Sequence, residues 1–376
     1  MKIRVVDQLY LICLSLGIIF TAISLTMVAS QLAWVQSISN SVLLGLCLVQ
    51  ILRTFYLLRN KTRWMLSWCF GFSVFLVSYL IADDRTLFEA FVYATGAIFV
   101  DYNKIIKTMK STWIWCALTV VALSLVNIIP TNTGFRETGI PRMSLGFVHP
   151  NTLGFVCFII GLLLLIDSYK KVTRNNIIKL LLLTLVAYFI ANSRTSSILL
   201  LALDIVMIAK VFRNSMITTF LKKRWMYTLV AISVIGLVGF TLWIATSYSG
   251  TIKQMMLNRF LNNRAQNGAY YMSLYGISLF GRSIPEFVLW SDNFTQLYLD
   301  NGYLLMLIKY GVIAATLYIM MILQAAKKAA KNRDAVIIMA IVLVALSLFA
   351  EQSALRWCFC PILMYPAAVN GDKTIK

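Results

Sequence analysis

The chain has 376 residues, of which 60% are apolar and only 13% are charged, and its mean hydropathy is +0.80. Soluble globular domains are about half apolar and about a quarter charged, so this composition excludes a soluble domain and predicts a polytopic membrane protein. The formal net charge of +20 lies almost entirely in short loops between apolar runs. That distribution is typical of membrane orientation, so we expect membrane lipid and no nucleic acid as a partner.

A helix crosses the bilayer core with about 20 apolar residues. Twelve segments of this kind are predicted, at 9–29, 34–57, 64–82, 86–101, 112–130, 150–168, 177–192, 196–212, 226–247, 301–324, 335–350 and 355–369. The predicted fold is therefore an all-α bundle of about twelve transmembrane helices, forming one membrane domain over residues 1–376. The first run leads into a second span rather than a cleavage site, so no cleaved signal peptide is expected.

Basic residues divide unequally between the two sides of this bundle. With both termini placed in the cytoplasm, the cytoplasmic segments hold 24 of the 34 lysines and arginines, as the rule for orientation requires. The cytoplasmic side uses sixteen Lys and eight Arg, whereas the external side uses one Lys and eight Arg. Because a guanidinium group binds phosphate or carboxylate through two parallel donors, this bias predicts an external anion site.

Two external connections are long enough to hold a site. One is 131–149, which leads to the only histidine, and the other is 248–300, which is unusually long for a connection. Within the second, the stretch TIKQMMLNRFLNNR at 251–264 places Ile252, Met256 and other apolar residues on one helical face. This pattern predicts an amphipathic helix at the membrane interface.

The only histidine, His149, precedes Pro150 at the start of the predicted span 150–168. Proline is favoured at the first helical position, which places His149 near the N-cap. A helix N-terminus attracts anions, and Arg142 and Arg136 add positive charge that favours a neutral imidazole. A neutral imidazole can accept a proton or a hydrogen bond. The alternative is that His149 only caps the helix.

Two later stretches carry further polar groups. In NSRTSS at 192–197, Arg194 stands at an external helix start, where it binds an anion or simply reaches the membrane interface. The stretch 291–311 contains Asp292, Asp300, Asn301, Tyr298, Tyr303 and Lys309. Its tyrosines stack on sugars or belong to the interfacial aromatic belt.

Ionisable residues inside spans are functional candidates by default. Lys309 is one, and Glu351, at the external end of the span 335–350, is its expected carboxylate counterpart. Glu89 and Asp204 also lie within spans, and Asp204 is the kind of group that a proton-coupled transporter uses. A single histidine and scattered cysteines supply too few ligands for zinc, so we expect no metal. No glycine pattern for nucleotides and no GxSxG turn occurs, and no cofactor is expected.

Three motifs together resemble a known family. RMSLGFVHPNTLG at 142–154, NSRTS at 192–196, and LFG at 279–281 followed by DNFTQLYLDNGYLLMLIKYG at 292–311 occur in this order between about 130 and 325. They resemble the motifs of bacterial membrane polysaccharide polymerases, the Wzy class of the O-antigen ligase/polymerase superfamily. The twelve-span layout with cytoplasmic termini is similar too.

The resemblance implies a metal-independent glycosyltransferase with a GT-C-like helical fold in the bacterial cytoplasmic membrane. Its substrate would be an oligosaccharide repeat unit on undecaprenyl pyrophosphate, polymerised at the outer face of the cytoplasmic membrane for capsule, exopolysaccharide or O-antigen. A chain-length regulator and a flippase would be its protein partners. A glycan ligase of the same superfamily remains an alternative. A polytopic transporter is the alternative from another class, although transporter sites lie near the midplane and these polar groups gather at external helix ends.

Under this hypothesis the external side chains take three roles. His149 orients or deprotonates the acceptor hydroxyl, with Glu351 and Asp292 as alternative catalytic groups. The pyrophosphate contacts are assigned to arginines at positions Arg142, Arg194, Arg259, Arg264, Arg136 and Arg282. Acceptor contacts or structural support are assigned to Asn151, Tyr298, Asp300, Asn301, Tyr303 and Lys309.

Overall fold

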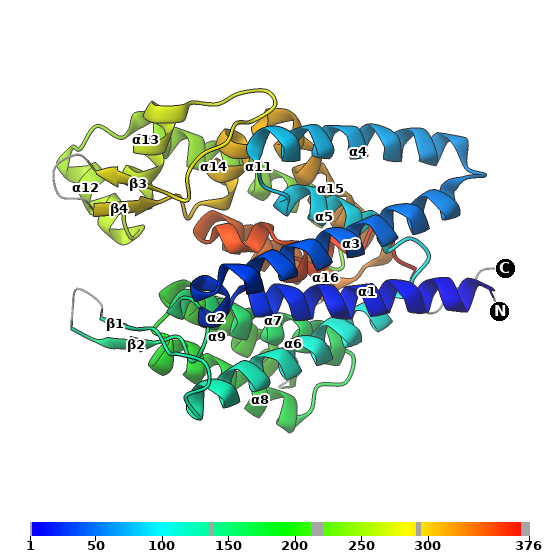
Figure 1. Cartoon of the computed structure of the whole chain (residues 1–376), viewed down its shortest axis with the longest axis horizontal. Coiled ribbons are helices and arrows are strands. Elements are labelled where there is room, and N and C mark those ends of the chain that lie inside the picture. Colours follow the sequence, from blue (N-terminus) through cyan, green and yellow to red (C-terminus); the bar gives the residue numbers. More distant parts are fainter. Residues whose placement is uncertain (1, 136–138, 212–220, 291–294, 370–376) are drawn as a thin grey trace.

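Most of the described chain is helical (Figure 1). The computed structural model describes residues 2–135, 139–211, 221–290 and 295–369. Its α-helices are α1 (Lys2–Ser24), α2 (Met27–Gln31), α3 (Ala33–Leu58), α4 (Thr62–Ala82), α5 (Thr86–Gly96), α6 (Tyr102–Leu125), α7 (Pro150–Ser168), α8 (Arg174–Leu185), α9 (Arg194–Val211), α11 (Met226–Ser247), α12 (Ile252–Phe260), α13 (Arg264–Tyr275), α14 (Gly302–Leu305), α15 (Gly311–Asn332) and α16 (Ala335–Ala350). The π-helical turns η1 (Val186–Ile190) and η2 (Met306–Tyr310) follow α8 and α14.

Within the described residues, seven helices are long and apolar enough to cross a membrane. They are α1, α3, α4, α6, α7, α11 and the continuous run from α14 through η2 to α15. These seven overlap seven of the twelve predicted spans, so the polytopic membrane fold is supported, although α6 begins at Tyr102 rather than at the predicted residue 112. The helix α7 is central, since 72% of its most apolar stretch is buried, against 22% for α6 at the periphery.

The other five predicted spans are shorter, interrupted or more charged. The prediction of a helix over 355–369 is wrong, because the chain forms three short 3-10 turns there: η3 (Gln352–Leu355), η4 (Trp357–Phe359) and η5 (Pro361–Met364). Pro361 and Pro366 each lack the backbone N–H that a continuous helix needs. Trp357 and its neighbours are buried, so this irregular backbone is enclosed by protein, which is a condition under which non-helical backbone is tolerated at membrane depth.

Two antiparallel hairpins, which the sequence patterns did not predict, occur in the two long connections. Strand β1 (Thr133–Phe135) pairs with β2 (Pro141–Met143), and β3 (Phe287–Trp290) pairs with β4 (Thr295–Tyr298). In Figure 1 both hairpins lie at one end of the molecule with α12 and α13, while the described chain ends lie at the other. The predicted segments 131–149 and 248–300 therefore share one end of the bundle.

The predicted amphipathic helix within 251–264 is α12. It begins with a capping box between Thr251 and Gln254. Three of its apolar side chains are largely exposed, with exposed fractions of 69% for Ile252, 69% for Met256 and 86% for Phe260. An exposed apolar face on a short helix beside the bundle is typical of a helix that lies on a membrane surface.

Candidate functional site

The segment before α7 is held by backbone hydrogen bonds to the junction between α1 and α2. Val148 N donates to Leu25 O over 2.8 Å, and Met27 N donates to Gly146 O over 3.0 Å. Gly146 has a φ of +88°, a value that side-chain-bearing residues rarely adopt, so the glycine permits this turn. Phe147 is fully buried beneath the turn. The backbone that carries His149 is thus fixed on both sides.

His149 is the N-cap of α7, with Pro150 at the first helical position as predicted. Its Nδ1 accepts a hydrogen bond from the Asn151 backbone N–H over 3.1 Å. Since a neutral imidazole carries one proton, that proton must then lie on Nε2. Partial removal from water, with a smaller contribution from Arg142, lowers the pKa of His149. At neutral pH the exposed ring therefore offers an Nε2–H hydrogen-bond donor. Its unprotonated nitrogen, Nδ1, is already occupied by the Asn151 backbone N–H.

Arg142 lies on β2 and reaches the start of α7. Its Nη2 donates to Asn151 Oδ1, and its Nε donates to Ala191 O over 3.3 Å. Asn151 thus links the guanidinium to His149, whose Nδ1 accepts from the Asn151 backbone. Desolvation lowers the pKa of Arg142, and the negative charge of Glu351 opposes that shift. The first predicted motif therefore forms one connected polar group.

The helix starts of α7 and α9 pack together beside this group. A Cβ built on Gly154 would lie 2.5 Å from Ser193 Cβ, so only glycine fits at this crossing. Ser193 is buried and donates to Ser196 Oγ over 3.1 Å. Arg194, the first residue of α9, is exposed. No hydrogen bond or ion pair of Arg194 occurs within the described residues, so its guanidinium is free to bind an anion there.

A second polar group forms where α16 ends. Glu351, the C-cap of α16, is buried and lies 3.6 Å from Arg264 Nη2, measured from its Oε1. Burial and the neighbouring Asp300 raise the pKa of Glu351 to about 8, although Arg264 and Arg142 oppose the shift. Burial likewise raises the pKa of Asp300, again against the charge of Arg264. Two carboxyl groups that cannot both ionise easily share this position.

The two polar groups interact electrostatically with each other. Arg142 and Glu351 affect each other's pKa, which places the His149 segment within electrostatic range of the pair Arg264 and Glu351. Five elements contribute to one site: β2, the start of α7, the start of α13, the start of α14 and the end of α16. Two arginines, two carboxyl groups and a neutral imidazole donor can bind an anion and exchange a proton.

Glycine again allows the close approach that builds the second group. A Cβ on Gly302 would lie 2.9 Å from Leu348 O and 3.5 Å from Glu351 O. The start of α14 therefore runs directly against the end of α16. Asn301 caps α14 through Leu304 N and also donates to Thr241 Oγ1 over 3.3 Å. Both hydrogen bonds of Asn301 are structural contacts at the start of α14.

The expected pairing of Lys309 with Glu351 is wrong. Lys309 Nζ lies 2.7 Å from Asp84 Oδ2, because the turn between α4 and α5 packs against η2. Glu351 instead pairs with Arg264, which the sequence offered only as a pyrophosphate contact. Lys309 is therefore a neutralised structural cation and not part of the site around His149.

The remaining predicted residues are dispersed. Tyr303 is fully buried and donates to Ala345 O over 3.0 Å, which leaves no ring face for a sugar. Tyr298 is 38% exposed, and its hydroxyl donates to Gln296 Oε1. Arg259 is exposed on α12, and Arg282 is half-buried with its backbone N–H on Lys309 O. Arg136 and Asp292 lie outside the described residues.

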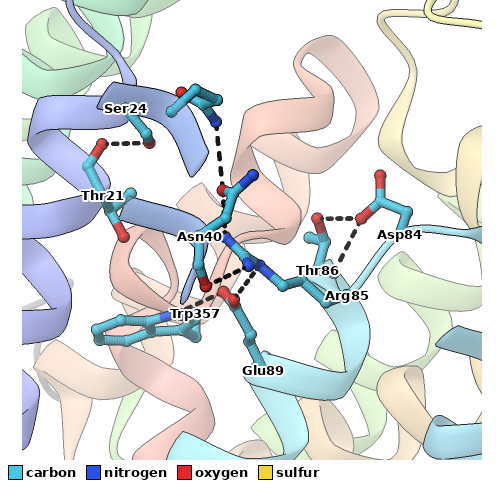
Figure 2. Close-up of polar contacts among 9 residues, drawn as sticks. Thr21, Ser24, Asn40, Asp84, Arg85, Thr86, Glu89 and Trp357 are labelled. Carbon is cyan, nitrogen blue, oxygen red and sulfur yellow. Dashed lines mark hydrogen bonds and ion pairs between the residues drawn. The ribbon is translucent and has the colours of Figure 1, made fainter. Parts of the chain in front are cut away.

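A further polar cluster, not assigned to the site, joins α3, α5 and η4 (Figure 2). Arg85 lies 2.6 Å from Glu89 Oε1 and donates to Asn40 through Nη1 and Nη2, and Trp357 Nε1 donates to Glu89 Oε2 over 3.2 Å. In the sequence, Glu89 stood out only because it lies within a predicted span. That position did not predict its contacts with Arg85 and Trp357. The mutual pairing of these groups indicates a structural cluster that fixes the irregular segment after α16.

Comparison with known proteins assigns neither a family nor a function to the chain. No family model, no curated protein and no solved structure matches the chain. The interpretation of the site therefore depends on the positions of Arg142, His149, Arg264, Asp300 and Glu351 and on the chemistry that they permit. The resemblance of the three sequence motifs to polysaccharide polymerases stays a prediction. Variants at these positions can test it.

Proposed function

We propose that this protein is a membrane glycosyltransferase of GT-C-like architecture that polymerises oligosaccharide repeat units carried on undecaprenyl pyrophosphate. One observation carries the proposal: the group formed by Arg142, Asn151 and His149 lies within electrostatic range of the group formed by Arg264 and Glu351. Arg142, Asn151 and His149 come from a motif that resembles the polymerase family, whereas Arg264 begins α13 and Glu351 ends α16. A polymerase needs an anion site and a proton acceptor at the same position, and this site offers both.

In the proposed reaction, a hydroxyl of the incoming repeat unit attacks the anomeric carbon of the growing chain. The bond from that carbon to the pyrophosphate oxygen breaks, and undecaprenyl pyrophosphate leaves with the electron pair. Arg142 and Arg264 stabilise the negative charge that develops on the leaving group. The hydroxyl proton passes to the ionised carboxylate of Glu351, whose raised pKa suits a general base near neutral pH. His149 donates its Nε2–H to a substrate oxygen and so orients it.

The test is genetic complementation of a deletion strain of the source organism, with the surface glycan separated by size. Deletion is expected to abolish the long-chain ladder while single repeat units are still displayed. A finished polymer that stays unattached would indicate a ligase instead. A normal glycan with altered solute uptake would indicate a transporter and contradict the proposal.

Variants of His149 separate chemistry from helix capping. Asparagine is a good N-cap, so His149→Asn keeps the cap of α7 but removes the outward Nε2–H donor. Loss of one donor to a transition state lowers a rate by about 100- to 1,000-fold, so this variant is expected to lose the ladder. A full ladder with His149→Asn would mean that His149 only caps the helix.

Arginine 142 offers a second variant in the same assay. Arg142→Lys keeps the charge but cannot hold Asn151 and Ala191 at once while facing a phosphate, so it is expected to shorten or remove the ladder. The matched control is Arg174→Lys, at the first residue of α8, which is expected to leave the ladder unchanged. Equal ladders from both variants would contradict a bidentate role for Arg142.

A further inference from the structure

A groove of about 870 Å³ opens between α4, α5 and α15, at the end of the bundle away from His149. Its interior is apolar, with Phe75, Phe91 and Leu317 among its lining residues. Phe75 and Phe91 stack with their ring centroids 5.1 Å apart. Because α4 and α15 belong to the helices long enough to span a membrane, this interior lies at membrane depth. Its volume is within the range of roughly 300–1,000 Å³ that is typical of ligand sites.

The rim of the groove is strongly basic. Five of its lining residues are cations, from the start of α4 on one side and the end of α15 on the other: Lys61, Arg63, Lys327, Lys328 and Lys331. No Asp or Glu is among the described residues that line the groove. The two sets of cations therefore face the same space from opposite walls, which is charge complementarity for an anionic group.

Two of these cations are already held in place, and three are not. Lys61 lies over the Phe99 ring, 4.2 Å from its centroid, and Lys328 donates to the carbonyl oxygens of Tyr365 and Pro366. In the described part of the chain, Arg63, Lys327 and Lys331 make no hydrogen bond or ion pair. Their donors are exposed and available to an anion.

The length of the groove fits one membrane leaflet. Along α15 it extends from Leu317 to Lys331, which corresponds to roughly 21 Å of helix. Half of a bilayer core is about 15 Å thick, so the groove spans a leaflet and reaches the head-group level. Trp64 at the rim is 67% exposed, as an interfacial tryptophan would be.

We propose that this groove binds an anionic phospholipid of the leaflet opposite the His149 site, with its acyl chains along α4 and α15 and its phosphate between Arg63, Lys327 and Lys331. Basic pockets between transmembrane helices recognise anionic head groups in this way. A peptide or a second copy of the chain would not fit equally well, because an apolar interior below a basic rim matches a molecule with an anionic head and long tails. The inference does not depend on the proposed glycosyltransferase activity.

The test measures lipids retained by the purified full-length chain. The protein is reconstituted into vesicles of phosphatidylcholine and phosphatidylglycerol in equal parts, extracted into detergent, and examined by native mass spectrometry. The unaltered chain is expected to retain phosphatidylglycerol in preference. Replacing Arg63, Lys327 and Lys331 together by Gln is expected to weaken that retention about tenfold or more, because each cation near an anionic lipid contributes to binding.

Two comparison variants make the outcome decisive. Replacing Lys171, Arg174 and Lys179 by Gln removes the same charge near the start of α8 and is expected to leave retention unchanged. Ser67→Trp fills the groove but keeps its basic rim, and it is expected to abolish retention.

Equal losses of phosphatidylglycerol retention from both triple variants would mean general charge attraction and would overturn the proposal. Equal retention of both lipids, or retention with Ser67→Trp, would also overturn the proposal. Thermal unfolding confirms that each variant is folded.

Discussion

Glu351 is a residue of the site whose charge is expected to change near neutral pH. Burial and the neighbouring Asp300 raise its pKa to about 8, so at neutral pH most molecules carry a protonated Glu351. A general base must be ionised to act. If Glu351 accepts the proton of the acceptor hydroxyl, the reaction rate at limiting substrate is expected to rise with pH towards about 8 and then level off. A membrane preparation that incorporates labelled repeat units, assayed across this range, measures the effect.

Stability is expected to change in the opposite direction over the same range. A raised pKa in the folded state means that the folded protein binds the proton more tightly than the unfolded chain. The resulting stabilisation is complete below the ordinary pKa of a glutamate and is lost as the pH rises through about 8. In Glu351→Gln both the alkaline rise in rate and this loss of stability should vanish. A rate profile that Glu351→Gln does not alter would exclude Glu351 as the base.

At the scale of single residues, the place of a residue beside a proline or a helix start could be predicted from the sequence. Its ion-pair and hydrogen-bond partners could not. Pro150 after His149 indicated the N-cap of α7, which the structure confirms. The partners of Lys309 and Glu351 depend on how remote segments pack, and nothing local to either residue encodes that. The tautomer of His149 likewise follows from one hydrogen bond to Asn151, which only the three-dimensional structure reveals.

At the scale of elements, the crossing of α7 and α9 sets the position of the His149 segment. Any side chain at Gly154 meets Ser193, so Gly154→Ala is expected to separate the two helix starts. Overpacking of this kind typically costs about 1–3 kcal/mol of stability. The expected result is a lower midpoint of thermal unfolding in detergent together with a weaker polymer ladder, because His149 moves relative to Glu351.

The matched control for this prediction is Gly236→Ala in α11. Apart from the neighbouring residues and the backbone of its own helix, no atom lies within 4 Å of a Cβ built on Gly236, so the added methyl group meets no other part of the protein. Alanine is favoured over glycine in a helix by about 1 kcal/mol, so this variant is expected to unfold at the same or a higher temperature. Equal destabilisation by both variants would show that the crossing at Gly154 is not tightly packed.

Long apolar runs were the elements that sequence reasoning predicted best. The boundaries of α7 agree with the predicted span 150–168, because a proline and an N-cap define its start. The short segments failed for two physical reasons. The hairpin strands have only three or four residues each, too few for a visible period, and the segment 355–369 is stabilised by surrounding protein rather than by its own helical bonds.

At the scale of the whole molecule, the two ends of the bundle carry different chemistry. The arginine-rich group around His149 lies at the end with the hairpins, and the lysine-rich groove lies at the end where the described chain begins and stops. The unequal use of Arg and Lys along the sequence predicts that the hairpin end faces outward, and this assignment stays a prediction.

This arrangement predicts opposite exposure of the two ends in intact cells. Ser249→Cys, beside α12, is expected to react with a membrane-impermeant maleimide from outside. Lys171→Cys, after α7, is expected to react only once the cells are permeabilised. The parent chain gives the background from its own seven cysteines.

A tag after Lys376 should behave like Lys171→Cys, because the irregular segment from Glu351 to Val369 returns the chain to the end where α6 begins. External labelling of that tag would mean that this segment does not cross the membrane, and external labelling of Lys171→Cys would reverse the assigned orientation.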